Sequence, residues 1–430
     1  MEKRKKEKKG KRIIFRIIPV ILIPAFCVLT IISTHSKKLV TNTIGNIIYI
    51  LLALLIYLFI VGIFILKNKG KKTKKSKGKK VLSAIKYIVT ILYVAGCITF
   101  VVLLYGPNKS FKNWLISTAM QTMNHQYLCK WFYNDNEIDK VLKNNYVKEE
   151  DEETNTDLIK IQEQETYANE YEEAILKRDK NAKYKIIELE VNGQKAYLAA
   201  IYDPSKVRVA TTKYLGTKGQ YVTEMAKDND AILAINGGGF VDPGYNGTGG
   251  KPCSVTFSFG KVITNNNYSY YTSSGGLIAL TNENKLIFIK NPTANKAMAQ
   301  GVRDGVYWAP FLIVNGKKSF IKGNGGWGYA ARTAIGQRSD GIILLLVVDS
   351  NASRTKGADM VDLTEIMSNY GAVNAANLDG GTSSVMVLPK AEALKYGKNC
   401  EDDYCYINDP INGSLKHRTR AIATSIIVTK

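Results

Sequence analysis

The chain has 430 residues, of which 45% are hydrophobic and 22% charged, and its 25 Tyr, 13 Phe and 4 Trp residues exclude a protein that is disordered throughout. Its 6 Cys residues are too few for a fold held by a framework of disulfides. The net charge of +22 is concentrated near the N-terminus: residues 1–105 contain 21 Lys and Arg against 2 Asp and Glu, which leaves 38 against 35 for residues 106–430 and removes the main argument for nucleic-acid binding.

Three long apolar runs follow in the first quarter of the chain. They cover about residues 13–33, 44–66 and 81–105, and the first is interrupted by Arg16 and two prolines. Because a helix needs roughly 20 apolar residues to cross a hydrocarbon core of about 30 Å, each run is long enough to span a membrane. The sequence therefore predicts a membrane anchor of three transmembrane helices over residues 1–105.

The basic segments that flank these runs predict their orientation. Residues 1–12 carry 8 Lys and Arg, and residues 67–80 carry 9 Lys and no acidic residue. Positively charged segments stay on the cytoplasmic side of a membrane. Three crossings then place residues 106–430 outside the cytoplasm, so we predict a multi-pass protein of the cell membrane with an extracellular C-terminal domain.

Residues 106–183 are predicted to connect the anchor to the rest of the chain. Large apolar side chains at three- and four-residue spacing over residues 106–135 predict a membrane-proximal helix with one apolar face. From residue 134 to residue 183 the chain is polar, with the acidic cluster Glu149–Glu153 near the centre. We interpret this stretch as a charged helical linker or stalk whose acidic face is solvated, and cation binding by the cluster is the alternative.

Residues 184–430 change to short apolar runs between Gly, Asn and Asp turns. The runs predict strands, and one clear helix is predicted at Asp362–Tyr370, with Asp362 as its cap. Many strands and few helices indicate an α+β domain with a large mixed or antiparallel sheet. The predicted strands are Tyr184–Val191, Ala196–Tyr202, Ala231–Asn236, Ser254–Phe259, Gly276–Leu280, Lys285–Ile289, Val306–Val314, Arg332–Gln337, Gly341–Val348 and Ala421–Val428.

The common catalytic and nucleotide-binding motifs are missing or out of context. The sequence contains no phosphate-binding GxxxxGKS or GxxxxGKT, no HExxH and no GxSxG. Gly323, Gly325 and Gly328 fit GxGxxG, but a strand-like segment follows them where a dinucleotide site needs a helix, so we reject that interpretation. The 3 His residues lie far apart in the sequence and predict no metal or Ser–His–Asp constellation.

Four predicted strands begin or end at a polar residue. A buried strand holds a side chain at its end rigidly at the sheet edge, so a carboxylate there is often functional. For each such residue taken alone, an Asx-turn or a helix cap is the alternative. We predict that the four strand ends share one cleft. The residues are Asn236 with Gly237, Gly238 and Gly239; Arg332; Asp349; and Asp379 with Gly380, Gly381, Ser383 and Ser384.

Longer stretches around these residues carry a family resemblance. They are AINGGGF at 234–240, ARTAIGQ at 331–337, LLLVVDS at 344–350 and AANLDGGTSSVMVL at 375–388. Together and in this order, they resemble the phosphodiester glycosidase family, and the resemblance covers residues 184–430. The sequence departs from the family pattern at Thr382, where a third glycine is frequent, at Ser350-Asn351 and at Arg420–Ala423.

The resemblance implies hydrolysis of a sugar-1-phosphodiester, which releases the sugar and a phosphomonoester. This chemistry needs a cation or amide groups for the phosphate, and a carboxylate that activates water or stabilises the oxocarbenium-like sugar. We assign Asp379 as general base or nucleophile, Asp349 as the second carboxylate, and Arg332 as a bidentate phosphate ligand. A divalent cation that bridges either carboxylate and the phosphate is left open.

Substrate binding is assigned to the polar neighbours of these residues. Asn236 is predicted to orient substrate hydroxyls or phosphate, and Ser383 and Ser384 to act as further ligands. The backbone N–H groups of the glycines are predicted to form an anion-binding nest. These glycines are Gly237, Gly238, Gly239, Gly380 and Gly381.

A non-catalytic module is the alternative from another functional class. Tyr268–Tyr271, Trp308 and Trp327 could stack on sugars, as in a polysaccharide-binding or scaffold module of an envelope assembly. The retained Asn, Arg and two Asp residues favour an enzyme, a membrane-anchored hydrolase of cell-envelope or exopolysaccharide glycans. Cys400 and Cys405 flank an acidic segment, and a disulfide between them is left open.

Overall fold

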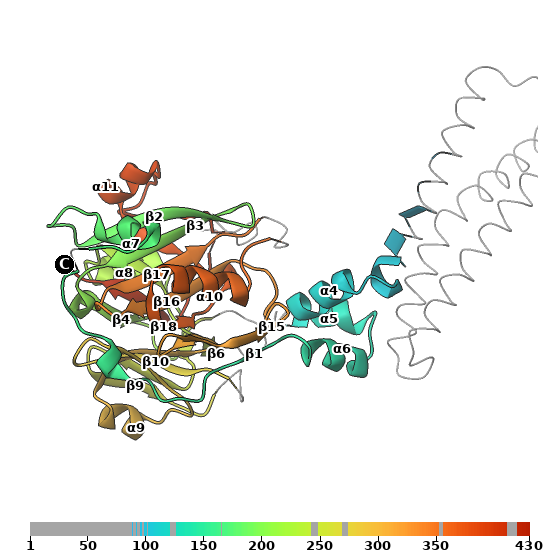
Figure 1. Ribbon diagram of the computed structural model, residues 1–430, viewed down its shortest axis with the longest axis horizontal. Helices are drawn as coiled ribbons and strands as arrows, with labels where there is room; N and C mark the ends of the chain where they lie inside the picture. The colour runs from blue at the N-terminus through green and yellow to red at the C-terminus, as the bar shows by residue number, and fades with distance from the viewer. Residues whose placement is uncertain are drawn as a thin grey trace, which may run out of the picture. The chain divides into compact units, whose positions relative to one another are not determined.

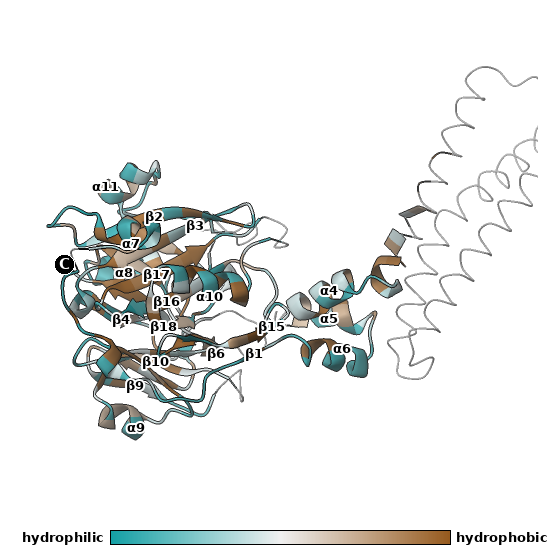
Figure 2. Ribbon diagram, in the orientation of Figure 1, coloured by the Kyte–Doolittle hydropathy of each residue, from teal (hydrophilic) through white to brown (hydrophobic). Residues whose placement is uncertain are grey.

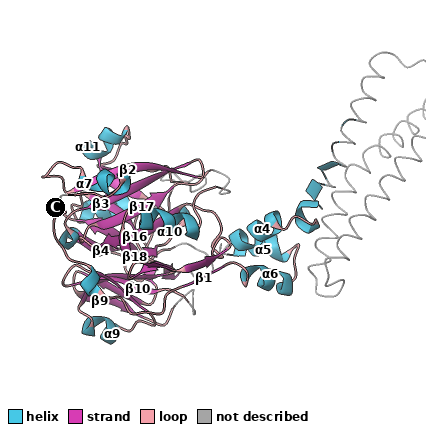
Figure 3. Cartoon of the chain, viewed as in Figure 1, coloured by secondary structure: helices cyan, strands magenta, loops and turns pink. Residues whose placement is uncertain are grey.

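The protein is described by a computed structural model and divides into two compact units. The structure describes residues 88, 92, 95–96, 99–100, 102–120, 126–164, 166–241, 248–268, 274–351, 356–410 and 419–430. The first unit comprises residues 1–143 and the second residues 144–430. Helices form the described part of the first unit, and strands predominate in the second (Figure 3).

Short helices form the core of the first unit. Their apolar side chains pack on one another, among them Ile116, Cys129 and Tyr133. The prediction of a single helix over residues 106–135 is corrected, because residues 131–134 leave the helical conformation and a new helix begins after them. The helices are α4 (Ser110–Met120), α5 (Gln126–Lys130) and α6 (Asp135–Leu142).

The predicted membrane anchor is not supported. Of the helices that the structure describes, none is both long enough and apolar enough to cross a membrane. A span needs roughly 20 residues, whereas α4 has 11. The prediction of three transmembrane helices, and of a multi-pass membrane location with an extracellular domain, is corrected on this finding. The first two predicted spans and the basic segments 1–12 and 67–80 lie outside the described residues, as does most of the third span.

A seven-stranded antiparallel sheet forms the centre of the second unit (Figure 1). Its strands lie in the order β14-β13-β18-β16-β17-β3-β2. Alternate side chains of β17 pack into two different cores, with Leu345 on one face and Leu344 and Leu346 on the other, which explains why this strand is apolar throughout. The strands are β2 (Tyr184–Val191), β3 (Gln194–Ile201), β13 (Phe311–Val314), β14 (Lys317–Lys318), β16 (Arg332–Arg338), β17 (Ile343–Val348) and β18 (Ala372–Asn377).

Two five-stranded sheets and two ribbons complete the second unit. The sheets have the orders β20-β19-β5-β21-β4 and β11-β10-β12-β8-β9, and the ribbons are β1-β15 and β6-β7. Every pairing between described strands is antiparallel, so of the two predicted alternatives the mixed sheet is corrected and the antiparallel arrangement is found, divided among several sheets. The strands are β1 (Tyr146–Lys148), β4 (Val207–Thr211), β5 (Leu233–Asn236), β6 (Phe240–Val241), β7 (Lys251–Pro252), β8 (Val255–Ser258), β9 (Lys261–Asn265), β10 (Gly276–Thr281), β11 (Leu286–Ile289), β12 (Val302–Trp308), β15 (Phe320–Lys322), β19 (Met386–Pro389), β20 (Tyr404–Tyr406) and β21 (Thr424–Val428).

The three large sheets enclose one hydrophobic core, and helices cover their outer faces (Figure 2). Each sheet contributes side chains to the enclosed core, such as Tyr197, Ile235 and Trp308. The seven-stranded sheet is covered by α7 (Glu170–Leu176) and α10 (Met360–Asn369), the β5 sheet by α8 (Val222–Asp228) and the β12 sheet by α9 (Ala294–Ala299). The remaining helical turns are η1 (Thr156–Leu158), η2 (Pro204–Lys206), η4 (Gly381–Ser383), α11 (Lys390–Ala393) and η5 (Leu394–Tyr396).

Two predicted elements differ from the structure in an instructive way. The strand predicted at Val306–Val314 is two strands of different sheets, and the chain leaves the first at Ala309-Pro310, where proline lacks a backbone donor. The predicted helix is α10, which begins earlier because Asp359 is its N-cap. Asp362 bonds back to the Asp359 amide and closes the capping box.

The acidic segment interpreted as a solvated linker contacts the sheets of the second unit. Residues 146–148 form β1, which pairs with β15. The Glu149 side chain is buried, and its Oε1 accepts hydrogen bonds from the backbone N–H groups of Gly275 and Phe311 at 2.6 and 2.9 Å. The interpretation as a helical linker or stalk with a solvated acidic face is therefore corrected for residues 146–149.

A disulfide closes a short loop beside β20. It joins Cys400 and Cys405, the pairing that the sequence left open. Cys129 and Cys253 are the free cysteines of the part that the structure describes, and both are buried.

Candidate active site

Asp379 lies in the turn that follows β18. The turn is fixed by hydrogen bonds on both sides of the carboxylate. The backbone N–H of Asp379 donates to the Gly237 carbonyl at 3.2 Å, and the N–H of Gly380 donates to the Asp379 Oδ1 at 2.9 Å. The Ser383 side chain also bonds to the carboxylate. β18 thus delivers one carboxylate to a rigid turn in contact with the end of β5.

The proton affinity of Asp379 is set by opposing effects. Burial is the largest of them and raises the pKa of this carboxyl group above its ordinary value. The hydrogen bond from Ser383, the charge of Arg420, the Gly380 N–H and the charge of Arg332 act against burial and lower the pKa. The site therefore combines a partly desolvated carboxylate with two cations, which suits a group that exchanges a proton or attacks a carbon atom.

Arg332 begins β16, and backbone carbonyls hold its side chain. The guanidinium Nε donates to the Ala358 carbonyl at 3.2 Å, and Nη2 donates to the carbonyls of Gly328, at 2.7 Å, and Trp327. The side chain is buried. Carbonyl groups fix the direction of a guanidinium without cancelling its charge, and that charge acts on Asp379.

Arg420 is a second cation of the site that the sequence analysis did not assign. Its guanidinium lies over the Phe240 ring, 4.6 Å from the ring centroid, and its charge acts on Asp379. The residue was noted as part of a departure from the family pattern, Arg420–Ala423. The signal that could have found it is its position just before β21, which pairs with the strand that ends in Asn236.

Asn236 braces the Asp379 turn. Its Nδ2 donates to the Asp379 carbonyl at 2.6 Å, and its Oδ1 accepts from the Thr333 hydroxyl at 2.7 Å and the Val385 N–H at 3.2 Å. The side chain is completely buried. These contacts give Asn236 a positioning role, in place of the direct contact with substrate that the sequence predicted.

The glycines after Asn236 do not form an anion nest. The N–H groups of Gly237 and Gly238 donate to the Thr424 carbonyl and hydroxyl at 3.0 and 3.1 Å, and the N–H of Gly239 donates to the Tyr307 carbonyl at 3.0 Å. A Cβ atom at Gly238 would lie 2.6 Å from the Tyr307 carbonyl oxygen. The predicted role of these amides in phosphate binding is corrected, because close packing of neighbouring strands requires the glycines and uses their donors.

The second pair of glycines is used in the same way. The N–H of Gly380 bonds to Asp379, and the N–H of Gly381 donates to the Ala331 carbonyl at 2.8 Å. Gly381 has a φ of +63°, which allows the turn into η4. Their predicted role as phosphate donors is corrected to shaping the turn that carries Asp379.

The two serines have different roles. Ser383 bonds directly to the Asp379 carboxylate. The Ser384 hydroxyl lies 3.1 Å from that of Thr333, which bonds to Asn236. Ser383 is therefore part of the site, and Ser384 belongs to the buried network that supports it.

Asp349 follows β17 and braces a different turn. Its Oδ1 accepts from the Asn408 Nδ2 at 2.9 Å, and its two oxygens lie 3.1 and 3.0 Å from the Asp409 nitrogen that donates to them. Burial raises the pKa of Asp349, and the Asp409 N–H opposes this. Asn408 also donates to the Ser384 carbonyl at 3.1 Å, which connects this turn to the network under Asp379. The structure thus gives Asp349 a supporting place, and a catalytic role for it stays a prediction.

Aromatic rings and a thiol lie near Arg332 and Asp379. The rings of Trp308 and Trp327 meet edge to face, with centroids 6.3 Å apart, and Trp327 also holds Arg332 through its carbonyl. Burial raises the pKa of the Cys253 thiol, and the nearby Asp379 charge adds to the effect. Of the tyrosines predicted to stack on sugars, Tyr270 and Tyr271 lie outside the described residues.

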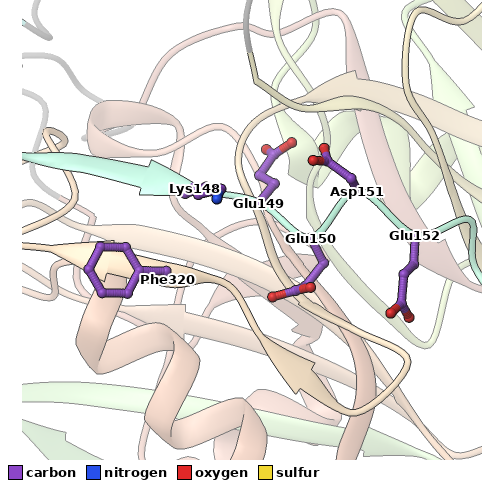
Figure 4. A pocket seen from close by; sticks show the side chains of 6 residues that line it. All are labelled: Lys148, Glu149, Glu150, Asp151, Glu152 and Phe320. Carbon is purple, nitrogen blue, oxygen red and sulfur yellow. The ribbon is translucent and has the colours of Figure 1, made fainter.

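A metal ion finds no ready ligand set. Among the described residues, no group of three or more His, Cys, Asp or Glu side chains is arranged to hold one. The acidic segment borders an open surface pocket (Figure 4). Two of its acids are paired, Asp151 with Lys290 at 2.9 Å and Glu152 with Lys317. The lining residues are Lys148, Glu149, Glu150, Asp151, Glu152 and Phe320, none of which is assigned to the candidate site.

Comparison with known proteins identifies the family of this sheet domain. Residues 229–429 match the family described as phosphodiester glycosidase. These residues form a phosphodiester glycosidase domain. The match includes all four stretches in which the sequence resembles that family, and the prediction of the family is confirmed for these residues.

Individual relatives of the phosphodiester glycosidase domain are distant. An uncharacterised SPbeta prophage-derived protein of Bacillus subtilis, YomE, is 25% identical over 43% of this chain and 28% of its own length. The bovine N-acetylglucosamine-1-phosphodiester alpha-N-acetylglucosaminidase is 35% identical over 17% of this chain and 14% of its own length. The chain therefore spans less than a third of either curated relative. The auto-inhibited catalytic domain of the zebrafish enzyme of the same name aligns with a TM-score of 0.44 and 19% identity, over 59% of this chain and 85% of that one.

Proposed function

We propose that the phosphodiester glycosidase domain hydrolyses a glycosyl 1-phosphodiester and releases a sugar and a phosphomonoester. The observation that carries this proposal is the Asp379 carboxylate, which lies within electrostatic reach of Arg332 and Arg420. A glycosyl phosphodiester carries a negative phosphate next to the reacting sugar carbon. The two arginines match the phosphate, and the carboxylate matches the positive charge that develops on the sugar.

The division of labour follows from the charges. Arg332 and Arg420 hold the phosphate oxygens and stabilise the charge that develops on the leaving phosphate. That leaving group is weakly basic, so the reaction depends little on a strong general acid. Asp379 activates water or attacks the sugar carbon and stabilises its oxocarbenium-like state. Ser383 and Gly380 hold the carboxylate by hydrogen bonds while it acts.

The sugar-1-phosphate portion of the substrate is supported by the bovine relative, which is named for the cleavage of N-acetylglucosamine-1-phosphodiester. The narrower substrate predicted from the sequence, a cell-envelope or exopolysaccharide glycan, rests on the family resemblance and belongs to this proposal. The Trp327 ring, which is only partly buried and whose carbonyl holds Arg332, offers a surface on which a sugar can stack, whereas the Trp308 ring is buried in the core.

The test is an assay of the full chain on the methyl diester of N-acetylglucosamine 1-phosphate in water enriched in heavy oxygen. We expect N-acetylglucosamine and methyl phosphate, with no heavy oxygen in the methyl phosphate, because water attacks the sugar carbon. Heavy oxygen in the phosphate would show cleavage of the P–O bond and contradict a glycosidase. Binding of the diester without turnover would favour the non-catalytic sugar-binding module.

A further inference from the structure

A glycine-rich loop holds Arg332. The GxGxxG spacing noted in the sequence falls in residues 323–328, between β15 and β16, and no helix follows it. Gly323, Gly325, Gly326 and Gly328 have φ values of +59°, +75°, +80° and +61°, so the backbone turns repeatedly through the left-handed region. This path aims the carbonyls of Trp327 and Gly328 at the Arg332 guanidinium.

The outer side of this loop packs against the start of the second unit. The Asn145 Oδ1 accepts a hydrogen bond from the Asn324 N–H at 3.4 Å, and a Cβ atom at Gly323 or Gly326 would overlap Asn145. A Cβ atom at Gly325 would lie 3.0 Å from both the Val147 and the Met360 side chains. The loop therefore lies between residues 144–147 on one side and the start of α10 on the other.

Residues 144–149 are held to the sheets of the second unit by strand pairing and by hydrogen bonds of Glu149. β1 pairs with β15 in the register Tyr146 to Lys322 and Lys148 to Phe320, directly before the glycine loop. The buried Glu149 then anchors the chain by accepting the two backbone N–H groups of Gly275 and Phe311. Figure 4 shows the Glu149 and Glu150 side chains pointing in opposite directions, as in an extended chain, and Glu149 is buried whereas Glu150 is partly exposed.

We propose that residues 144–149 form a positioning strap for the active site, in which Asn145 sets the glycine loop and the loop carbonyls set the direction of Arg332. Asn145 is a positioning residue, since it acts through the loop. The strap lies outside the matched family region 229–429, so the family match does not itself account for it. The inference rests on the proposed function, because it assigns a role in phosphate binding to Arg332.

The first test compares variants of the full chain on the methyl diester. Asn145→Ala removes the side chain that meets the loop, and we expect kcat/KM to fall about tenfold or more, since a small misplacement of a binding group is costly. Asn145→Asp keeps the acceptor oxygen and should retain most of the wild-type kcat/KM. Asn144→Ala is the matched control, because this neighbour is exposed and bonds to the Lys322 side chain. Equal losses for the Ala variants at 144 and 145 would overturn the proposal.

A double-mutant cycle separates positioning from a general structural role. In the Arg332→Lys background the fork that the loop carbonyls hold is absent, so Asn145→Ala should change kcat/KM by less than about twofold. Gly326→Ala, whose Cβ atom would overlap the Asn145 backbone at a φ of +80°, should show the same loss and the same dependence on Arg332. If Asn145→Ala costs the same factor in both backgrounds, Asn145 does not act through Arg332 and the proposal is wrong.

Hydrogen exchange tests the strap without any substrate. We expect amides of residues 323–332 to exchange at least about tenfold faster in Asn145→Ala than in Asn144→Ala, because the loop loses its outer support. Unchanged exchange would overturn the strap. If wild-type protein shows no turnover, the proposed function fails, and the exchange measurement still decides whether the strap fixes the loop.

Discussion

Arg420 acts on Asp379 through its charge, so replacing Arg420 changes a measurable property of the site, the pKa of the Asp379 carboxyl group. Burial raises the pKa of the Asp379 carboxyl group, and the charge of Arg420 lowers it. Arg420 stacks on Phe240 and is only partly buried, so its replacement disturbs the core less than replacement of the buried Arg332.

The pH dependence of kcat/KM tests this electrostatic arrangement. If the ionised Asp379 is the active form, activity falls as the pH is lowered through its raised pKa, so the acidic limb lies above the ordinary Asp value of about 3.9. Arg420→Gln removes a cation that lowers the pKa and should move the limb to higher pH. A limb that stays in place or moves to lower pH would contradict an interaction between these residues.

The sequence indicates which strand ends bring polar residues together. Asp379 and Arg332 lie at the ends of neighbouring buried strands, and Ser383 lies in the turn after Asp379, so the three interact, while their catalytic and binding roles stay predictions. The predicted glycine nest fails for a physical reason. A glycine is required both where a ligand approaches the backbone and where another strand does, and residue type alone does not distinguish the two.

At the scale of the secondary-structure elements, the segment that carries Glu149 shows how charge patterns mislead. A run of acids indicates a solvated face, yet in an extended chain every second side chain points inward. Glu149 is the inward residue, and two backbone N–H groups compensate its burial. By contrast, β17 was readily predicted, because a strand buried on both faces is a continuous apolar run.

The buried Glu149 predicts a pH effect on stability. Burial raises the pKa of Glu149 above its value in the unfolded chain, so the folded state binds the proton more tightly. This contribution to the free energy of unfolding is fully present below about pH 4.3, the unfolded pKa, and is lost as the pH rises through the folded pKa. Glu149→Gln does not titrate and should therefore gain stability relative to wild type between pH 4 and pH 7.

Urea unfolding of both proteins across this range measures the difference. Glu150→Gln is the matched control, since the Glu150 side chain borders the surface pocket. A difference between wild type and Glu149→Gln that is constant with pH would show that the Glu149 carboxyl is not desolvated in the folded protein.

At the scale of the whole molecule, a buried ionic network joins the sheets. Asp304 of β12 is fully buried, and its Oδ1 accepts the N–H groups of Val209 in β4 at 3.0 Å and Phe259 at 2.9 Å. Its Oδ2 accepts from Arg303 and from Arg208, the latter at 3.1 Å. This carboxylate connects the β12 strand to β4 of a second sheet.

Removing Asp304 should destabilise the second unit. Asp304→Ala leaves the buried Arg303 without its carboxylate, and we expect a loss of about 3–5 kcal/mol in the free energy of unfolding. Arg208→Ala removes a partner that is partly exposed and should cost about 1 kcal/mol or less. Thermal or urea unfolding measures both, and equal small losses would show that the network does not join the sheets.

The membrane anchor predicted from the apolar runs shows what hydropathy alone does not establish. Hydropathy reports the length of an apolar run, whereas a span also needs one continuous helix. No helix of the described residues meets both conditions, and the runs at 13–33 and 44–66 lie outside those residues. The sheet domain was predicted better, because its strands are short and each is bounded by its own turn residues.

The central claim is that Asp379 performs the hydrolysis, and the turnover of Asp379→Asn tests it most directly. The amide keeps the size of the side chain and can still accept from Gly380, but it has no charge. We expect turnover of the methyl diester to fall by about 10²–10⁴-fold or more, with the melting temperature nearly unchanged. Asp230→Asn makes the same change at an exposed position with a φ of +48°, which asparagine tolerates, and should retain full activity. Turnover by Asp379→Asn close to that of Asp230→Asn would contradict the account.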